Sequence, residues 1–145
     1  MASQASISAT ELDQLVLASI EAKSNSYSPY SKFRVGCALL TFQDRVIVQG
    51  CNVENASYGL TICAERCAIF KAVSQGYRKF AAVAISSDLE TGFAYPCGAC
   101  RQVLNEFGDM EVILVKDKTS IKSTRLANLL PHAFGPSDLE EAKRS

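Results

Sequence analysis

Apolar residues near the start of the chain recur with the spacing of a helix. The segment from about Ser8 to Lys23 predicts an amphipathic helix, because its apolar stripe has the 3.6-residue repeat. That stripe is formed by Leu12, Leu15, Val16, Ser19 and Ile20. Ser8, followed three residues later by Glu11, has the pattern of a capping box and favours a helix start there. Pro29, within the polar segment 25–31, predicts a loop after the helix.

Apolar runs further along the chain predict strands. Phe33–Phe42 and Arg45–Asn52 have the pattern of two strands joined in a hairpin. Phe80–Ile85 and Glu111–Lys116 are short apolar runs typical of buried strands, and a fifth strand over 120–124 stays an open alternative.

Helical patterns separate the later strands. Cys63–Ser74 and Gly98–Phe107 predict two helices, and Gly76 and Gly108 are suitable residues to end them. A short helix is expected over Leu126–Leu130, followed by a polar tail.

The order of these elements favours an α/β layered fold, because strands separated by helices form βαβ crossovers. The chain of 145 residues fits one domain, which we expect to span 1–145. Helices that start just after strands place their N-termini at one edge of the sheet, where ligands gather in such folds.

Composition narrows the function. Lys and Arg together number 15, as do Asp and Glu, so the formal net charge is zero and argues against a nucleic-acid partner. No apolar run approaches the roughly 18 residues of a membrane span, and the polar start lacks signal-peptide features. We therefore expect no membrane partner and a cytoplasmic location, with the nucleus as a second compartment. In a reducing compartment the six cysteines indicate buried thiols, metal ligands or reactive thiols before disulfides.

Three of these cysteines lie at predicted helix starts. Cys63 begins the motif Cys-Ala-Glu-Arg, and Cys97 and Cys100 form a Cys-x-x-Cys pair after Pro96. Helix N-termini lower thiol pKa values, and three thiolate ligands leave a fourth position on zinc for water. Cys-Ala-Glu followed by Pro-Cys-x-x-Cys is the zinc-deaminase signature, in which the glutamate, here Glu65, is a general acid and base.

The residue after Glu65 bears on the charge of this site. Three thiolates and one Zn²⁺ carry a formal charge of −1, which weakens the metal as a Lewis acid. Arg66 is placed to donate hydrogen bonds to a ligand sulfur and offset that charge.

Seven motifs spread over nearly the full length carry a resemblance to a known family, and these are 27–31 (YSPYS), 33–36 (FRVG), 52–58 (NVENASY), 62–66 (ICAER), 96–102 (PCGACRQ), 129–131 (LLP) and 134–136 (FGP). With these motifs the chain resembles the small cytidine deaminases that act on free nucleosides as homotetramers. It departs from that family at Arg34, where many relatives have proline, and at Cys67, where threonine or serine is usual.

The resemblance implies a three-layer α-β-α fold with a mixed, mainly five-stranded sheet. It also implies one Zn²⁺ per subunit, a pyrimidine nucleoside as substrate and a homotetramer with shared active sites. Asn52 and Glu54 would hold the ribose hydroxyls, Phe33 would pack on the base, and Tyr58 and Phe134 would complete a neighbouring subunit's site. The other substrate-binding residues implied are Val53, Asn55, Ala56, Ser57 and Ala64.

The implied reaction is hydrolysis of cytidine and 2′-deoxycytidine to the uracil nucleosides and ammonia, a step of pyrimidine salvage. A zinc-activated water would attack C4 of the ring, and Glu65 would take its proton and deliver one to N3.

Other interpretations of the cysteines stay open. Cys67 lies four residues after Cys63 on one helix face and is the candidate fourth ligand of a closed, structural zinc site in a protein-binding module. Cys97 and Cys100 alone also fit a redox dithiol. A deaminase of polynucleotides, or of a base-containing antibiotic, would use the same zinc chemistry.

Taken residue by residue, several candidates also have ordinary structural interpretations. Phe33 and Phe134 are typical core aromatics, and Asn52 and Glu54 are typical turn residues. The single histidine, His132, is expected at the surface or an interface. Three cysteines are expected as buried packing residues, and these are Cys37, Cys51 and Cys67.

Overall fold

Five strands form one mixed sheet with the order β2-β1-β3-β4-β5 in the computed structural model, which describes residues 6–144. The first five residues of the polar start lie outside the described range. β1 pairs antiparallel with β2 and β3, β3 pairs parallel with β4, and β4 pairs antiparallel with β5. The strands are β1 Val35–Thr41, β2 Ile47–Cys51, β3 Phe80–Ser87, β4 Glu111–Val115 and β5 Ile121–Arg125.

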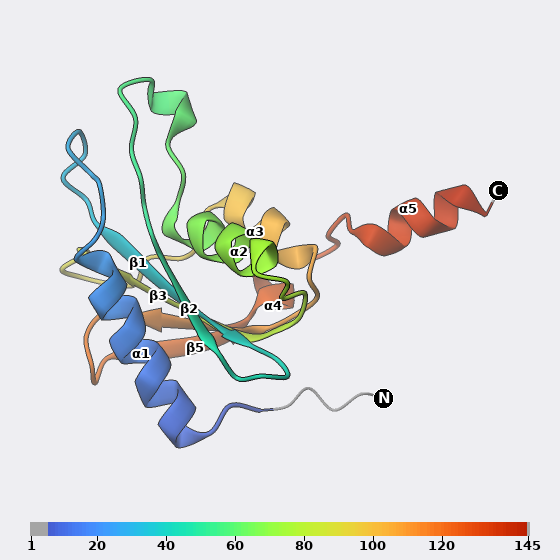
Figure 1. The fold of residues 1–145 in the computed structure, drawn as a ribbon, viewed down its shortest axis with the longest axis horizontal. Helices are drawn as coiled ribbons and strands as arrows, with labels where there is room; N and C mark the ends of the chain where they lie inside the picture. The colour runs from blue at the N-terminus through green and yellow to red at the C-terminus, as the bar shows by residue number, and fades with distance from the viewer. Residues whose placement is uncertain (1–5, 145) are drawn as a thin grey trace.

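Helices cover both faces of this sheet (Figure 1). α1, Ala9–Lys23, packs against one face, while α2, Ala64–Ser74, and α3, Gly98–Asn105, lie on the other. Successive strand residues point to opposite faces of the sheet: Leu39 packs in the core with α2 and α3, and Leu40 packs in the core with α1. The expected three-layer α-β-α architecture with a five-stranded mixed sheet is confirmed.

The predicted capping box at the start of α1 is present. The Ser8 hydroxyl accepts a hydrogen bond from the Glu11 amide at 3.1 Å, and the Glu11 carboxylate accepts one from the Ser8 amide at 2.8 Å. These two bonds satisfy amides that have no partner within the helix.

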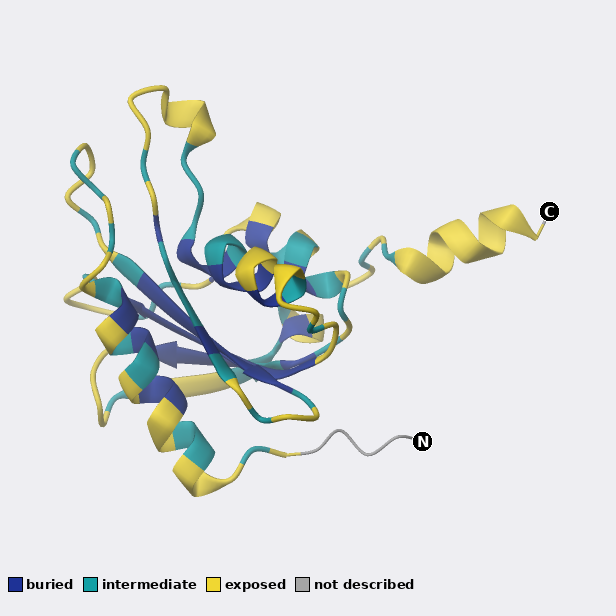
Figure 2. Cartoon of the chain, viewed as in Figure 1, coloured by how far each residue is buried: buried dark blue, intermediate teal, exposed yellow. Residues whose placement is uncertain are grey.

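The structure differs from the predicted elements chiefly in the hairpin strands and in the polar tail. Phe33 precedes β1, and β2 begins at Ile47 because Arg45 adopts the left-handed φ of 54° in the turn. The polar tail contains a helix, α5 (Pro136–Lys143), which starts with proline and with a Gly135 amide that donates to Asp138 at 2.8 Å. α5 extends away from the sheet and is exposed along its length (Figure 2), so no apolar stripe marks it in the sequence.

Two shorter elements complete the described part of the chain. A 3₁₀ helix, η1, covers Tyr58–Leu60 in the projecting segment between β2 and α2, and α4 covers Leu126–Leu129. Within residues 6–144 the structure has no helix with the length and apolarity that a membrane crossing requires.

Gly50 allows α2 to lie directly on β2. A Cβ atom at this position would stand 2.5 Å from the Ala68 amide nitrogen and 2.7 Å from the Ala64 carbonyl oxygen. We expect Gly50→Ala to destabilise the fold by about 1–3 kcal/mol, because helix and strand must separate. Thermal unfolding at a fixed protein concentration measures this, and Gly59→Ala is the control because no atom lies within 4 Å of its added Cβ. Equal midpoints for the two variants would contradict the close packing.

Candidate functional site

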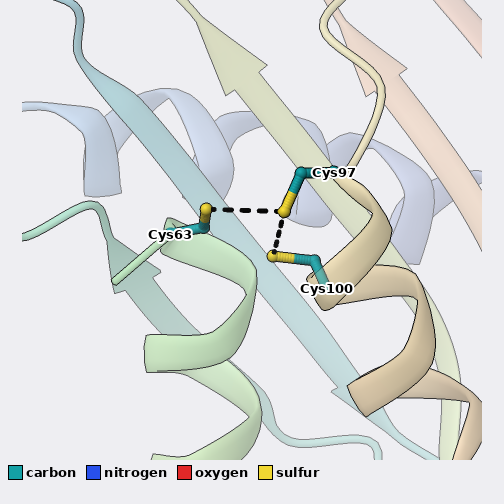
Figure 3. Close-up of side chains that lie close together, drawn as sticks. All are labelled: Cys63, Cys97 and Cys100. Carbon is teal, nitrogen blue, oxygen red and sulfur yellow. Dashed lines mark hydrogen bonds between the residues drawn. The ribbon is translucent and has the colours of Figure 1, made fainter. Parts of the chain in front are cut away.

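Two helix N-termini bring the three predicted cysteines together. Cys63 is the N-cap residue of α2 and Cys97 that of α3, while Cys100 lies in the first turn of α3. The Cys63 and Cys97 sulfurs are 3.8 Å apart, and the Cys97 and Cys100 sulfurs are 3.5 Å apart (Figure 3). Cys63 and Cys97 are 34 residues apart in the sequence, but the fold brings their thiols next to each other.

These thiols fit a tetrahedral zinc ion. Zn–S bonds of about 2.3 Å place two sulfurs of a tetrahedron about 3.8 Å apart, which agrees with the measured separations. All three sulfurs lie within 4.8 Å of one another, and among the described residues this is the group able to hold a metal ion. Cys67 is not part of the group, so the arrangement favours three thiolate ligands over a closed four-cysteine site.

Hydrogen bonds already stabilise one thiolate. The hydrogen bond from Cys100 lowers the pKa of Cys63 to about 5, and Arg66 contributes further through its Nη2, which donates to the Cys63 sulfur at 3.5 Å. The pKa of Cys100 is raised by the same bond to Cys63 and by burial. Arg66 Nε is buried without a hydrogen-bond partner in the described part of the chain. The guanidinium therefore brings positive charge and a hydrogen-bond donor to the Cys63 sulfur.

Glu65 lies beside the cysteines on α2. Its side chain is buried, and burial raises the pKa of its carboxyl above the usual value. Glu65 Oε2 accepts a hydrogen bond from the Cys100 thiol at 3.6 Å. A carboxyl group of raised pKa next to a metal-binding cluster is suited to take up and release protons.

A cavity of about 280 Å³ opens onto this cluster. Its lining includes seven residues that the sequence predicted, among them thiol, carboxyl and amide side chains. They are Phe33, Asn52, Glu54, Cys63, Ala64, Glu65 and Cys97. The remaining lining residues were not anticipated from the sequence, and these are Ser31, Val35, Thr61, Ile85, Ala94 and Tyr95. Ala94 and Tyr95 directly precede Pro96 and Cys97, and this position in the sequence could have predicted that they lie near the site.

Asn52 and Glu54 hold the loop that forms one wall of the cavity. Asn52 Nδ2 donates to the Phe33 carbonyl at 2.8 Å, and Asn52 Oδ1 accepts from the Val35 amide at 2.9 Å. Glu54 accepts from the amides of Tyr30 and Ser31 at 3.0 and 3.1 Å and from the Ser31 hydroxyl. The bond from that hydroxyl is the main cause of the lowered pKa of Glu54, which keeps the group ionised.

A second cavity, of about 200 Å³, shares Ser31, Glu54 and Thr61 with the first and adds Tyr30 and Tyr58. Tyr58 is 73% exposed, and its ring centroid lies 5.6 Å from that of Tyr30. Val53 and Asn55 to Ser57 belong to the same projecting segment as Tyr58 but do not line the main cavity.

Phe134 lies apart from both cavities. Its side chain is 59% exposed, and its carbonyl accepts hydrogen bonds from Gln102 and Asn105 of α3. The alternative that Phe134 is a core aromatic is therefore wrong, whereas His132 is exposed as expected. Among the remaining cysteines, Cys37 is buried as expected, but Cys51 and Cys67 are only half-buried. The latter two lie where α2 packs over the sheet-edge strand β2.

The largest of the described cavities lies elsewhere. It has about 530 Å³ and is formed by the β1–β2 turn and the residues between α2 and β3, including Asp44, Tyr77 and Arg78. None of the predicted site residues line it, so the smaller cavity at the cysteines is the candidate active site.

Comparison with known proteins agrees with this geometry. Residues 9–116 match the family model of the cytidine and deoxycytidylate deaminase zinc-binding region. A cytidine deaminase of Sporosarcina psychrophila is 50% identical over 134 residues, which cover 91% of this chain and 97% of that protein. A probable cytidine deaminase of Dictyostelium discoideum is 48% identical over 129 residues, covering 89% of this chain and 87% of that protein.

A solved structure shows the same fold. The crystal structure of cytidine deaminase from Burkholderia pseudomallei superimposes with a TM-score of 0.80 at 45% identity, and covers 88% of this chain and all of that chain. The matched region contains Cys63, Glu65, Cys97 and Cys100. The chain belongs to the cytidine and deoxycytidylate deaminase family and has its zinc-binding region.

Proposed function

We propose that this chain deaminates cytidine and 2′-deoxycytidine hydrolytically, giving uridine or 2′-deoxyuridine and ammonia in pyrimidine salvage. One observation carries the proposal: a single cavity is lined by Glu65, by two of the three clustered thiols, and by Asn52 and Glu54. The thiols and Glu65 suit the reacting ring, and Asn52 and Glu54 suit a sugar. The volume of the cavity, about 280 Å³, is close to the lower end of the range for small-molecule sites.

Asn52 and Glu54 have the hydrogen-bonding capacity to bind a ribose. Glu54 is ionised and can accept further hydrogen bonds from hydroxyl groups. Asn52 Oδ1 already accepts from Val35 and Ser26, so its second Nδ2 hydrogen is the group left to face the sugar. Residues 53 and 55–58 would close the cavity around the sugar, and Phe33 would pack on the base.

Glu65 would move the protons of the reaction. As a carboxylate it takes one proton from the attacking water and, as the acid, delivers it to N3 of the ring; it then takes the second proton, from the hydroxyl now on C4, and delivers it to the departing amine. Its burial and raised pKa favour exchange between these two forms. The Ala64 backbone would orient the pyrimidine edge. A zinc ion on Cys63, Cys97 and Cys100 would supply Lewis-acid activation of the water.

A substrate panel tests the proposal. Zinc-loaded protein is incubated with cytidine, 2′-deoxycytidine, deoxycytidylate and a single-stranded oligodeoxynucleotide, and ammonia release is followed together with ultraviolet absorbance. We expect turnover of the two nucleosides. Faster reaction of the oligonucleotide would mean that a polynucleotide is the substrate, and absence of turnover at one zinc per chain would reject the proposal.

Arg66 should matter more for rate than for metal binding. Arg66→Ala removes the donor at 3.5 Å from the Cys63 sulfur and leaves the three thiols in place. We expect turnover to fall by about 10–100-fold while zinc stays near one per chain. Zinc analysis and steady-state kinetics on the same sample measure both quantities. Parallel loss of zinc and turnover would show that Arg66 supports structure only.

We further propose a homotetramer whose active sites are shared between subunits. Tyr58 and Phe134 are large and exposed. Tyr58 lies in η1, within the projecting segment between β2 and α2, and Phe134 lies shortly before α5, which extends away from the sheet (Figure 2). Exposed aromatic residues of this kind are typical of interfaces. In the assembly, each chain would lend these side chains to a neighbour's cavity.

Complementation between two variants tests the sharing. Phe134→Ala would damage the neighbour's cavity, and Glu65→Gln would damage its own. After denaturation and joint refolding, mixed tetramers would contain sites in which Glu65 and Phe134 are both intact, so activity should rise well above that of either variant alone. Additive, unenhanced activity in verified mixed tetramers would mean that each site is built from one chain.

A further inference from the structure

The wall of the cavity at Phe33 is a segment without regular secondary structure. Phe33 precedes β1, and its backbone groups bond to side chains: its amide donates to Ser31 Oγ at 3.0 Å, and its carbonyl accepts from Asn52 at 2.8 Å. Lys32, the preceding residue, adopts a left-handed φ of 58°. A non-glycine residue in that conformation persists only where its surroundings hold it. The placement of Phe33 therefore depends on side-chain anchors on both sides of it.

Asn52 supplies the anchor on the side of β2, and Asp88 supplies one on the side of β3. Asp88 Oδ2 accepts from the Arg34 amide and from Arg34 Nε, each at 3.0 Å, and Asp88 Oδ1 accepts from Arg34 Nη2 at 3.1 Å. The Asp88 amide in turn donates to the Arg34 carbonyl at 3.2 Å. Lys23 Nζ lies 3.3 Å from Asp88 Oδ1 and ties α1 to the same carboxylate.

The Arg34–Asp88 contact is unusual for a surface ion pair because it engages side chain and backbone together. Two parallel charge-assisted bonds fix the guanidinium, and reciprocal backbone bonds fix the register of Arg34 against Asp88. The bonds to Arg34 lower the pKa of Asp88 to about 2, so the contact stays ionised at neutral pH.

A different role for Arg34 would be to bind a substrate phosphate at the cavity mouth. The structure argues against it, because Asp88 already neutralises the guanidinium and the carboxylate of Glu54 lines the same cavity. A phosphate would meet negative charge from both groups.

We infer that Arg34 and Asp88 are positioning residues, which together hold Phe33 in place as the wall against which the base packs. The inference rests on the proposed function, because it assumes that Phe33 contacts the base. Neither residue lines the cavity, and both act through the Arg34 backbone, which directly follows Phe33. Arg34 thus provides by hydrogen bonding the rigidity that a proline ring would give to the backbone at the same position.

A double-mutant cycle between Phe33 and Arg34 tests this dependence. Arg34→Gln should raise the KM for cytidine about fivefold, the effect of an ion pair at the upper end of the range for exposed pairs. kcat should stay within about twofold, because packing on the base contributes to binding in ground and transition state alike. In a Phe33→Ala background the same change should have no further effect, and Arg34→Lys should recover part of the loss. The control is Arg78→Gln, since that guanidinium donates to the carbonyls of Val73 and Tyr77, does not line the cavity at the cysteines, and should leave KM unchanged.

Hydrogen–deuterium exchange supplies a readout independent of turnover. The amides of residues 32–35 should exchange faster in Arg34→Gln and in Asp88→Ala than in the parent chain. Unchanged exchange would overturn the inference, as would multiplicative effects of Phe33→Ala and Arg34→Gln on KM. Greater loss for deoxycytidylate than for cytidine would instead assign Arg34 to a phosphate. A parent chain inactive on cytidine would reject the proposed function, and exchange would still decide whether Arg34 and Asp88 hold the segment.

Discussion

Glu65→Gln should abolish deamination and leave the metal site intact. Glutamine has nearly the shape of glutamate, so the buried site keeps its packing, but the amide cannot take a proton from water or deliver one to the ring. We expect kcat to fall by about 10²–10⁴-fold, the contribution usual for a positioned general acid and base. The measurement combines cytidine turnover with zinc analysis by mass spectrometry, and zinc should remain at one per chain because Glu65 is outside the group of three thiols.

The matched control is Glu90→Gln, the same change at an exposed carboxylate between β3 and α3. Its kcat and zinc content should equal those of the parent chain. A Glu65→Gln variant that retains zinc and keeps more than about a tenth of the parent kcat would contradict the proton-transfer role. Loss of zinc in that variant would instead mean that the carboxylate helps to hold the metal.

The arrangement of the layers could be predicted from the sequence because both faces of the sheet are covered. Strands buried on two sides are continuously apolar, as in Phe80–Ile85, and the intervening helices end at glycines that adopt the left-handed region. Gly76 and Gly108 have φ values of 100° and 94°, as a C-terminal glycine requires. Likewise, the spacing of the three cysteines at helix starts predicts a shared metal site.

The positions of Phe33, Tyr95 and Phe134 depend on tertiary contacts and could not be predicted from the local sequence pattern. The apolar pattern at Phe33 resembles the start of a strand, but its backbone is held by Ser31 and Asn52 instead of a neighbouring strand. Tyr95 has no periodic signal and enters the cavity only because it precedes the N-terminus of α3. Phe134 lies outside the core with an exposed side chain, which its aromatic character alone did not indicate.

Loss of a single metal ligand should have the other large effect. Cys97→Ser is the informative change because Cys97 is exposed, so the substitution costs little packing and its effect reports on the metal. A serine hydroxyl is a far poorer zinc ligand than a thiolate. We expect zinc well below one per chain and turnover reduced by more than about 100-fold, since residues that merely support a ligand already contribute about 10–100-fold.

Cys67→Ser is the matched control, because it makes the same atomic change on α2 outside the group of three thiols. If three thiolates hold the metal, this variant keeps its zinc and its turnover, and cobalt substituted for zinc gives the absorption bands of the parent chain. A cobalt spectrum altered by Cys67→Ser would mean that a fourth thiolate closes the site. A metal with four thiolate ligands has no position left for water, so the same result would also remove the chemical basis for hydrolysis at this cavity. The two variants Cys97→Ser and Cys67→Ser each replace one sulfur atom by oxygen, and comparing their zinc content and turnover therefore distinguishes a catalytic zinc centre from a structural one.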